Sequence, residues 1–231
     1  MHWIGKLRNL LDVVLQDECP LCQRPVAQAL CNDCKRQLHR CQLNHPSEFW
    51  QPPLPVLAWG DYGGALKRSL AALKYQNQPQ LGHLLGDELA QTWLAASPTL
   101  GSAASASRVR LNPIVVPIPL HASKQKQRGY NQAELIANAF CHRTGLRLQA
   151  NGLARTRATE AQFGLSPAAR SQNLADAFQL GKDFLKQRPH QPVLLLDDIY
   201  TTGTTVRSAA QTLRRHQIAV IGVAAVAKAG E

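Results

Sequence analysis

Two neighbouring carboxylates, Asp197 and Asp198, follow an apolar run in the stretch VLLLDDIYTTGTT, residues 193–205. Vicinal carboxylates can each accept a hydrogen bond from a neighbouring pair of sugar hydroxyls. The loop that follows offers hydroxyls and backbone N–H groups to a phosphate, and its glycine permits a tight turn into the next helix, whose positive dipole end favours an anion. The stretch therefore predicts a cradle for a ribose 5-phosphate, formed by Asp197, Asp198, Thr201, Thr202, Gly203, Thr204 and Thr205.

Two other interpretations of this stretch compete with the first. A buried strand that ends in a solvated Asp–Asp turn would use the threonines only to cap a helix. A Walker B strand would need a partner loop of the form G-x-x-x-x-G-K-[ST], and the sequence contains none. The sugar-phosphate interpretation is preferred because every residue after the apolar run then has a chemical use.

Four of the six cysteines form two Cys-x-x-Cys pairs that are separated by eight residues. Paired thiolates of this spacing favour a closed tetrahedral site for zinc or iron and sulfur, which staples a segment too small for its own core. Disulfides are the alternative, but a cytoplasmic protein keeps its thiols reduced. We predict a structural zinc site, whereas Cys41 is ambiguous and Cys141 belongs to a helix core. The predicted zinc ligands are Cys19, Cys22, Cys31 and Cys34.

The order of the predicted elements favours an α/β fold with a parallel, doubly wound sheet. Asn131 can cap the helix that begins after it, and Gly145 can end it. Ligands bind such sheets beyond the carboxyl ends of the strands, which is where Asp197 and Asp198 stand. Apolar periodicity predicts helices over 1–18, 62–76, 81–96, 130–145 and 204–217, strands over 114–119, 193–197 and 218–227, a linker over 46–56 and a loop over 97–113. The predicted division is an N-terminal helix and zinc-knuckle module over 1–50 and the α/β domain over 51–231.

Charge and hydropathy restrict the classes of partner. The formal net charge is +11, which favours phosphorylated ligands or nucleic acid. No apolar run is long enough for a membrane span, and the N-terminus lacks the uninterrupted apolar region of a signal peptide. The sequence therefore predicts a cytoplasmic protein with no membrane span.

Residues 193–205 resemble the PRPP-binding signature of type I phosphoribosyltransferases, in which an apolar strand, two acids and T-T-G-x-T follow one another. More of the chain, about residues 15–227, resembles the ComF/GntX family, which is linked to bacterial competence and DNA utilisation. Its cysteine knuckle is matched by the four cysteines, and its PVPL…RGFNQ segment by PIPLHASKQKQRGYNQ, residues 117–132, with Tyr130 where the family favours Phe. Its arginine-rich stretch is matched by Arg155, Arg157, Thr159, Gln162, Arg170, Asn173, Ala177 and Phe178. Many relatives carry a further cysteine pair, of which only Cys41 remains here.

The resemblance implies a type I phosphoribosyltransferase-like parallel sheet with flanking helices, preceded by a small zinc module with four cysteine ligands. It implies Mg²⁺ and PRPP as ligands, with Asp197 and Asp198 on the ribose and residues 201–205 on the 5-phosphate. The basic loop after residue 119 then takes the position of the pyrophosphate, and Arg128 can bind its oxygens as a fork. A solvated surface run is the alternative for this loop, which supplies Lys124, Lys126 and Arg128.

Two functions follow from the resemblance. The first is Mg²⁺-dependent transfer of phosphoribosyl from PRPP to an unknown acceptor, catalysed by Asp197, Asp198 and Arg128, in competence, DNA uptake or DNA utilisation. The second is a non-catalytic factor that binds single-stranded DNA or competence and DNA-processing proteins. A flap over residues 153–178 would close over PRPP, and its arginines, Arg155, Arg157 and Arg170, could contact either PRPP or nucleic-acid phosphates.

Overall fold

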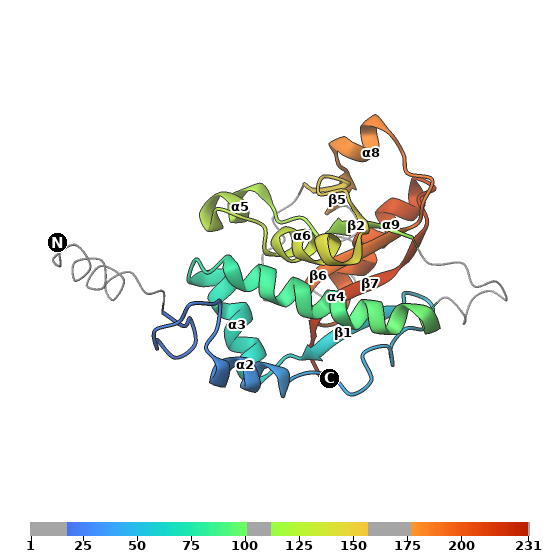
Figure 1. The fold of residues 1–231 in the computed structure, drawn as a ribbon. Helices are drawn as coiled ribbons and strands as arrows, with labels where there is room; N and C mark the ends of the chain where they lie inside the picture. Colours follow the sequence, from blue (N-terminus) through green and yellow to red (C-terminus); the bar gives the residue numbers. More distant parts are fainter. Residues whose placement is uncertain (1–17, 101–111, 157–176, 231) are drawn as a thin grey trace, which may run out of the picture.

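The computed structural model describes residues 18–100, 112–156 and 177–230, which form a parallel sheet between layers of helices (Figure 1). The sheet has five strands in the order β1-β7-β6-β2-β3, and every neighbouring pair is parallel. A separate antiparallel pair joins β4 to β5. The strands are β1 (Val56–Asp61), β2 (Ile114–Pro117), β3 (Arg147–Leu148), β4 (Leu153–Arg155), β5 (Phe178–Leu180), β6 (Val193–Tyr200) and β7 (Val220–Lys228).

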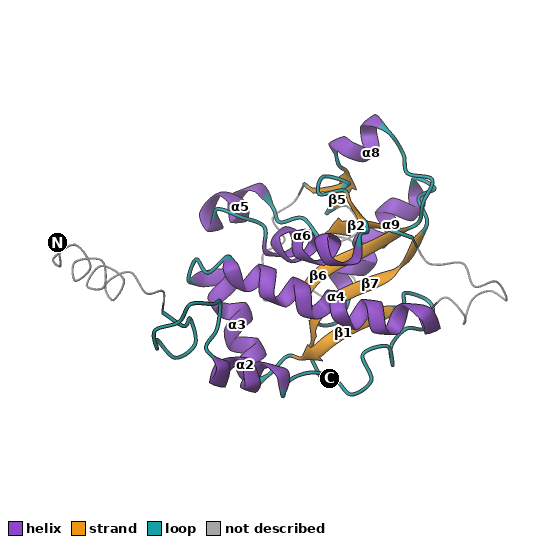
Figure 2. Ribbon diagram, in the orientation of Figure 1, coloured by secondary structure: helices purple, strands orange, loops and turns teal. Residues whose placement is uncertain are grey.

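The apolar runs of the central strands are buried because helices cover both faces of the sheet (Figure 2). Alternate residues of β6 enter different cores: Leu194 and Leu196 pack with α3, α4 and α6, whereas Val193 and Leu195 pack with α9. The helices are α2 (Asn32–His39), α3 (Gly64–Tyr75), α4 (Gln80–Leu100), α5 (Ala122–Arg128), α6 (Gln132–Thr144), α8 (Lys182–Lys186) and α9 (Thr204–Arg215). None of the helices within the described residues is long and apolar enough to cross a membrane.

The predicted start and end of α6 are confirmed. The Asn131 side chain accepts a hydrogen bond from the Ala133 N–H at 3.1 Å and so caps the first turn. Gly145 has φ +73° and ends the helix in the left-handed conformation that favours glycine. The Asn131 amide also donates to the Ile118 carbonyl at 3.1 Å, which fixes the start of α6 against the end of β2.

Several predicted boundaries were wrong. Strand β6 continues through Tyr200, so Asp197 and Asp198 lie within the strand and not at its end, because its ladder with β7 extends to Lys228. Helix α4 runs to Leu100, into the predicted loop over 97–113. Residues 122–128 of the predicted basic loop form the short helix α5. Strand β1 begins at the last residue of the predicted linker and otherwise occupies residues 57–61, to which the sequence assigned no element. The predicted N-terminal helix lies almost wholly outside the described residues.

The cysteine module, which is the described part of the predicted module over 1–50, packs directly on the sheet domain. Its residues Leu30, Cys34 and Leu38 belong to the same core as Leu57 and Trp59 of β1. The N–H of Leu43 donates to the Trp59 carbonyl at 2.9 Å, and the N–H of Asp61 donates to the Cys41 carbonyl at 2.8 Å. The two parts of the chain on either side of residue 50 share one hydrophobic core. Their division into two domains stays a prediction.

Candidate functional site

The acid pair of β6 lies at the carboxyl edge of the sheet and is almost fully enclosed. Asp197 and Asp198 expose 9% and 4% of their surface. The Asp198 N–H donates to Asp197 Oδ1 at 2.8 Å. Burial raises the pKa of Asp197 well above its ordinary value, and the neighbouring charge of Asp198 raises it further, against a smaller opposing effect of Lys74.

Two side chains that the sequence did not predict hold the second acid. The Lys74 ammonium, from the last turn of α3, forms an ion pair with Asp198 Oδ2. Gln132 Nε2, from the first turn of α6, lies 3.4 Å from Asp198 Oδ1 and donates a long hydrogen bond to it. The sequence analysis predicted a helix over 62–76 but assigned no role to Lys74, whose spacing of four residues from the apolar Leu70 puts it beside the buried face of that helix. That spacing is the signal that could have identified Lys74.

The threonine loop joins β6 to α9 as predicted. Gly203 has φ +71°, and a side-chain Cβ at this position would lie 2.7 Å from Tyr200 Cζ and 2.8 Å from Arg207 Nη1. The Arg207 guanidinium donates to the Thr202 carbonyl, and the hydroxyls of Thr202 and Thr204 lie 2.7 Å apart. Thr201 and Thr202 are exposed, Thr204 and Thr205 are half-buried, and the first turn of α9 contains no acidic residue. The loop therefore presents hydroxyls and a helix N-terminus to an anion.

Arg128 is connected to the acid pair through one side chain, that of Gln132. Its guanidinium donates to Gln132 Oε1 and lies over the Tyr75 ring, 5.6 Å from the ring centre. The structure therefore connects Arg128, Gln132 and Asp198 in one chain of contacts. The other two predicted pyrophosphate residues lie on the same short helix, where the side chains of Lys124 and Lys126 are exposed.

Arg155 is the last residue of β4, and its guanidinium interacts electrostatically with Asp197. Its guanidinium packs over the Phe178 ring at 5.5 Å. Burial lowers the pKa of Arg155, and the charge of Asp197 partly opposes this effect. β4 and β5 pair at the base of the predicted flap, but most of the flap, with Arg157 and Arg170, lies outside the described residues.

The four predicted metal-ligating cysteines form one cluster, with all four sulfurs within 4.8 Å of one another. A zinc ion with Zn–S bonds of about 2.3 Å separates its tetrahedral sulfurs by roughly 3.8 Å, so the cluster has the size of a zinc site. The N–H of Gln23 donates to the Cys19 carbonyl at 2.8 Å in a tight turn, and the second pair begins α2. The cluster contains Cys19, Cys22, Cys31 and Cys34.

The ionisation of the cluster suits a metal. Burial opposes ionisation of Cys19, but hydrogen bonds from backbone groups of Cys31, Leu21 and Cys22 outweigh it and lower its pKa to about 6. Burial and the neighbouring sulfurs raise the pKa of Cys34. A shared negative charge of this kind is what a divalent cation neutralises.

The remaining two cysteines take no part in the cluster. Cys41 Sγ lies 3.6 Å from the carbonyl oxygens of Gln37 and Gly63, and the residue packs against the core. The structure therefore assigns Cys41, which was ambiguous in the sequence, to packing. Cys141 is buried in α6, as predicted, and burial raises the pKa of its thiol to about 12.

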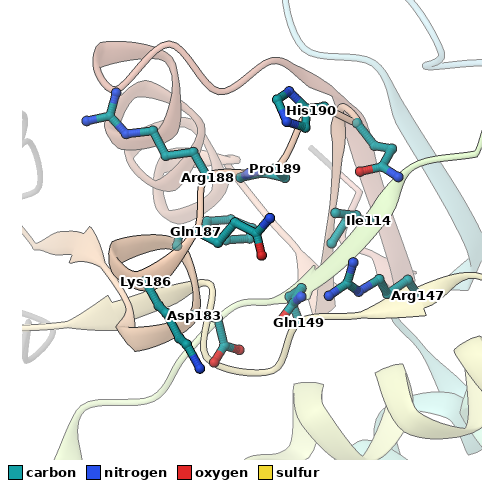
Figure 3. A pocket seen from close by; sticks show the side chains of 11 residues that line it. Ile114, Arg147, Gln149, Asp183, Lys186, Gln187, Arg188, Pro189 and His190 are labelled. Carbon is teal, nitrogen blue, oxygen red and sulfur yellow. The ribbon is translucent and has the colours of Figure 1, made fainter.

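A polar cavity of about 420 Å³ lies at the opposite edge of the sheet, where β2 begins (Figure 3). With the Gln149 amide oriented to satisfy its neighbours, it donates to Asp183 Oδ2 and accepts from Arg147, each at 3.0 Å. Figure 3 shows the charged end of Arg188 pointing away from the cavity. No predicted site residue lines this cavity, so it is separate from the acid pair.

No family model matches the chain. It is 30% identical over 224 residues to the DNA utilization protein YhgH of Salmonella typhimurium, with 89% of this chain and 94% of that protein covered. It is 28% identical over 230 residues to competence protein F of Haemophilus influenzae, covering 96% and 95%, and 24% identical over 210 residues to competence protein ComFC of Bacillus subtilis, covering 89% and 75%.

Solved structures give a weaker likeness. A glutamine phosphoribosylpyrophosphate amidotransferase from B. subtilis and an allosteric regulatory enzyme of purine biosynthesis each align with a TM-score of 0.40 and 18% identity, over 68% of this chain. This chain spans only 30% and 29% of their lengths, respectively. On the identity and coverage of its sequence relatives, the chain belongs to the ComF family of competence and DNA utilization proteins.

Proposed function

We propose that this protein binds PRPP or a related phosphoribosyl ligand with Mg²⁺ at the carboxyl edge of its sheet and acts in DNA uptake or DNA utilisation. One observation carries the proposal: β6 brings a buried acid pair and a Gly203-centred turn into α9 together within eight residues. The names of its relatives, DNA utilization protein and competence protein, support the biological role.

The chemistry assigned to the site follows from its donors and acceptors. The carboxylate oxygens of the acid pair would accept hydrogen bonds from the two ribose hydroxyls, and the 201–205 loop would hold the 5-phosphate with N–H and hydroxyl groups. Hard carboxylate and hydroxyl oxygens suit Mg²⁺, which when bound would neutralise charge on the pyrophosphate. Arg128, held by Gln132 and Tyr75, would bind the pyrophosphate oxygens.

The proposed reaction is phosphoribosyl transfer. The bond between ribose C1 and the pyrophosphate oxygen breaks, the pyrophosphate leaves with the bonding electrons, and a nucleophilic acceptor forms the new bond at C1. Arg128 would stabilise the charge that develops on the leaving group, and the acid pair would keep the ribose in place.

The test is calorimetric titration of PRPP with Mg²⁺ into the wild type and into the double variant Asp197→Asn/Asp198→Asn. Binding by the wild type that the double variant loses would support the cradle. Asp61→Asn is the matched control, because Asp61 is an exposed carboxylate at the end of β1, two strands away from β6 in the same sheet. Absence of PRPP binding to folded, zinc-loaded wild type would refute the proposal.

A non-catalytic nucleic-acid-binding factor is the second candidate, and the net charge of +11 favours it. This candidate predicts binding of a fluorescent single-stranded oligonucleotide whose affinity falls steeply as salt concentration rises. Strong oligonucleotide binding together with no binding of PRPP would favour this candidate over the first.

We also propose that the cysteine cluster holds a structural zinc ion. Four protein sulfurs complete a tetrahedral shell and leave no position for a substrate. Thiolate sulfur selects zinc over Mg²⁺, so the two proposed metals would not compete for one site.

A further inference from the structure

Three consecutive residues at the end of α3 each contact a different part of the candidate site. The Tyr130 hydroxyl donates to the Leu73 carbonyl. Lys74 forms the ion pair with Asp198, and the Tyr75 ring lies under Arg128. This turn of α3 belongs to an element that the sequence did not connect with the site at all.

The burial of Lys74 distinguishes it from the other lysine of the same helix. Only 17% of the Lys74 side chain is exposed, and its Asp198 partner exposes 6% of its side chain. Lys67, two turns earlier, is exposed and lies 5.7 Å from the centre of the Tyr62 ring. Because a charge removed from water is costly unless it is paired, the enclosed position of Lys74 depends on Asp198.

The charged groups around the acid pair come from different elements. Lys74 reaches it from α3 and contacts Asp198 directly, and Arg155 of β4 interacts electrostatically with Asp197. Gln132 is neutral and separates Asp198 from Arg128. Lys74 therefore balances the charge of Asp198 through direct contact.

We propose that Lys74 is a positioning residue of the phosphoribosyl site, which holds the Asp198 carboxylate in the orientation that receives the sugar. The adjacent Tyr75 supports Arg128, so one turn of α3 fixes the sugar end and the pyrophosphate end of the site relative to each other. This inference rests on the proposed function for its ligand, but its account of Asp198 applies to the ligand-free protein as well.

The first test compares Lys74→Met, Lys74→Arg and the control Lys67→Met by calorimetric titration of PRPP with Mg²⁺. We expect Lys74→Met to bind PRPP at least about tenfold more weakly, since removing one partner of a buried pair costs well over 1.4 kcal/mol. Lys74→Arg should recover most of the affinity, and Lys67→Met should match the wild type. Wild-type affinity in Lys74→Met would overturn the inference.

The second test needs no ligand. Urea unfolding measures the free energy of unfolding of the wild type, Lys74→Met, Asp198→Asn, the double variant and the control Lys67→Met. Removing one partner of a buried ion pair leaves the other charge unpaired, so we expect the loss in the double variant to be clearly smaller than the sum of the two single losses. Additive losses overturn the inference whatever PRPP does. Coupled losses without PRPP binding to the wild type would instead refute the proposed ligand alone. Should Lys74→Met fold poorly, Lys74→Gln replaces it in both measurements.

Discussion

At the scale of single residues, Asp197 lowers the stability of the fold that contains it. Burial first, and repulsion from Asp198 second, raise its pKa in the folded protein above the ordinary 3.8. Below pH 3.8 the Asp197 carboxyl is protonated in both the folded and the unfolded state, so its ionisation does not change the free energy of unfolding. As pH rises above it, the unfolded chain ionises while the folded protein keeps the proton, and the free energy of unfolding falls. Such a cost is expected of a group that is kept for binding, as in the function proposed above.

We therefore predict that Asp197→Asn stabilises the protein at pH 7.5 but not at pH 4. The asparagine oxygen can still accept the hydrogen bond from the Asp198 N–H, and the substitution removes the ionisable group. The free energy of unfolding at pH 7.5 should therefore rise by about 1–3 kcal/mol. Thermal or urea unfolding of both proteins at the two pH values measures it. The exposed Asp61→Asn should follow the wild type at both, and an equal gain at pH 4 and 7.5 would contradict the ionisation argument.

At the scale of elements, the turn from β6 into α9 leaves no room for a side chain. Gly203 combines a left-handed backbone with close contacts to Tyr200 and Arg207, whereas Gly145 has nearly the same φ and open space around its Cβ position. A comparison of alanine substitutions at the two glycines therefore separates the cost of backbone strain, which both share, from the cost of crowding, which applies only to Gly203. The strain alone costs roughly 1–2 kcal/mol for a residue with a side chain.

Gly203→Ala should accordingly destabilise the protein more than Gly145→Ala, by about 1 kcal/mol or more, and should weaken binding of PRPP. Gly145→Ala should lose roughly 1–2 kcal/mol of stability without a change in PRPP affinity, since it lies at the far end of α6. Urea unfolding and calorimetry on both variants provide the comparison. Equal losses of stability in the two variants would show that the crowding around Gly203 relaxes freely.

The sequence predicted those elements whose signals are local. The uninterrupted apolar runs identified β2, β6 and β7, and Asn131 and Gly145 identified the ends of α6. The helix α5 was missed because all its side chains are at least partly exposed, so it has no apolar periodicity to detect. The last three residues of β6, Asp198 to Tyr200, were missed because the apolar run ends at the acid pair, whereas pairing with β7 continues the strand past these acids despite their low strand preference. Lys74 was missed because its partner, Asp198, is distant in sequence and only the tertiary fold brings them together.

At the scale of the whole molecule, the cysteine module and the sheet domain share one hydrophobic core. His39 Nε2 of α2 lies 2.7 Å from Glu88 Oε1 of α4, and the His39 and Trp59 rings form a T-shaped pair with their centres 6.5 Å apart. The acid pair lies on β6, two strands inward from β1, against which the module packs. A change in the module should therefore affect the stability of the sheet domain.

We predict that purified protein contains about one zinc ion per chain and that Cys22→Ser lowers both zinc content and the thermal unfolding temperature. Cys41→Ser should retain zinc, because Cys41 lies outside the cluster. Metal analysis by mass spectrometry and thermal unfolding measure the two effects. Full stability of Cys22→Ser after zinc loss would show that the shared core holds the module without metal.

The antiparallel contact between residues 41–43 and β1 has a consequence for solubility. β1 is an outer strand of the sheet, and the N–H of Leu43 and the carbonyl of Cys41 satisfy backbone groups of Trp59 and Asp61 that would otherwise face solvent. Unpaired strand edges recruit other chains, and native proteins meet this hazard by covering them. The position of the segment just after α2 means that loosening the cysteine module would uncover this edge. Metal depletion would then turn the folded protein into a self-associating species before the sheet itself unfolds, so metal supply would control how much protein stays in solution.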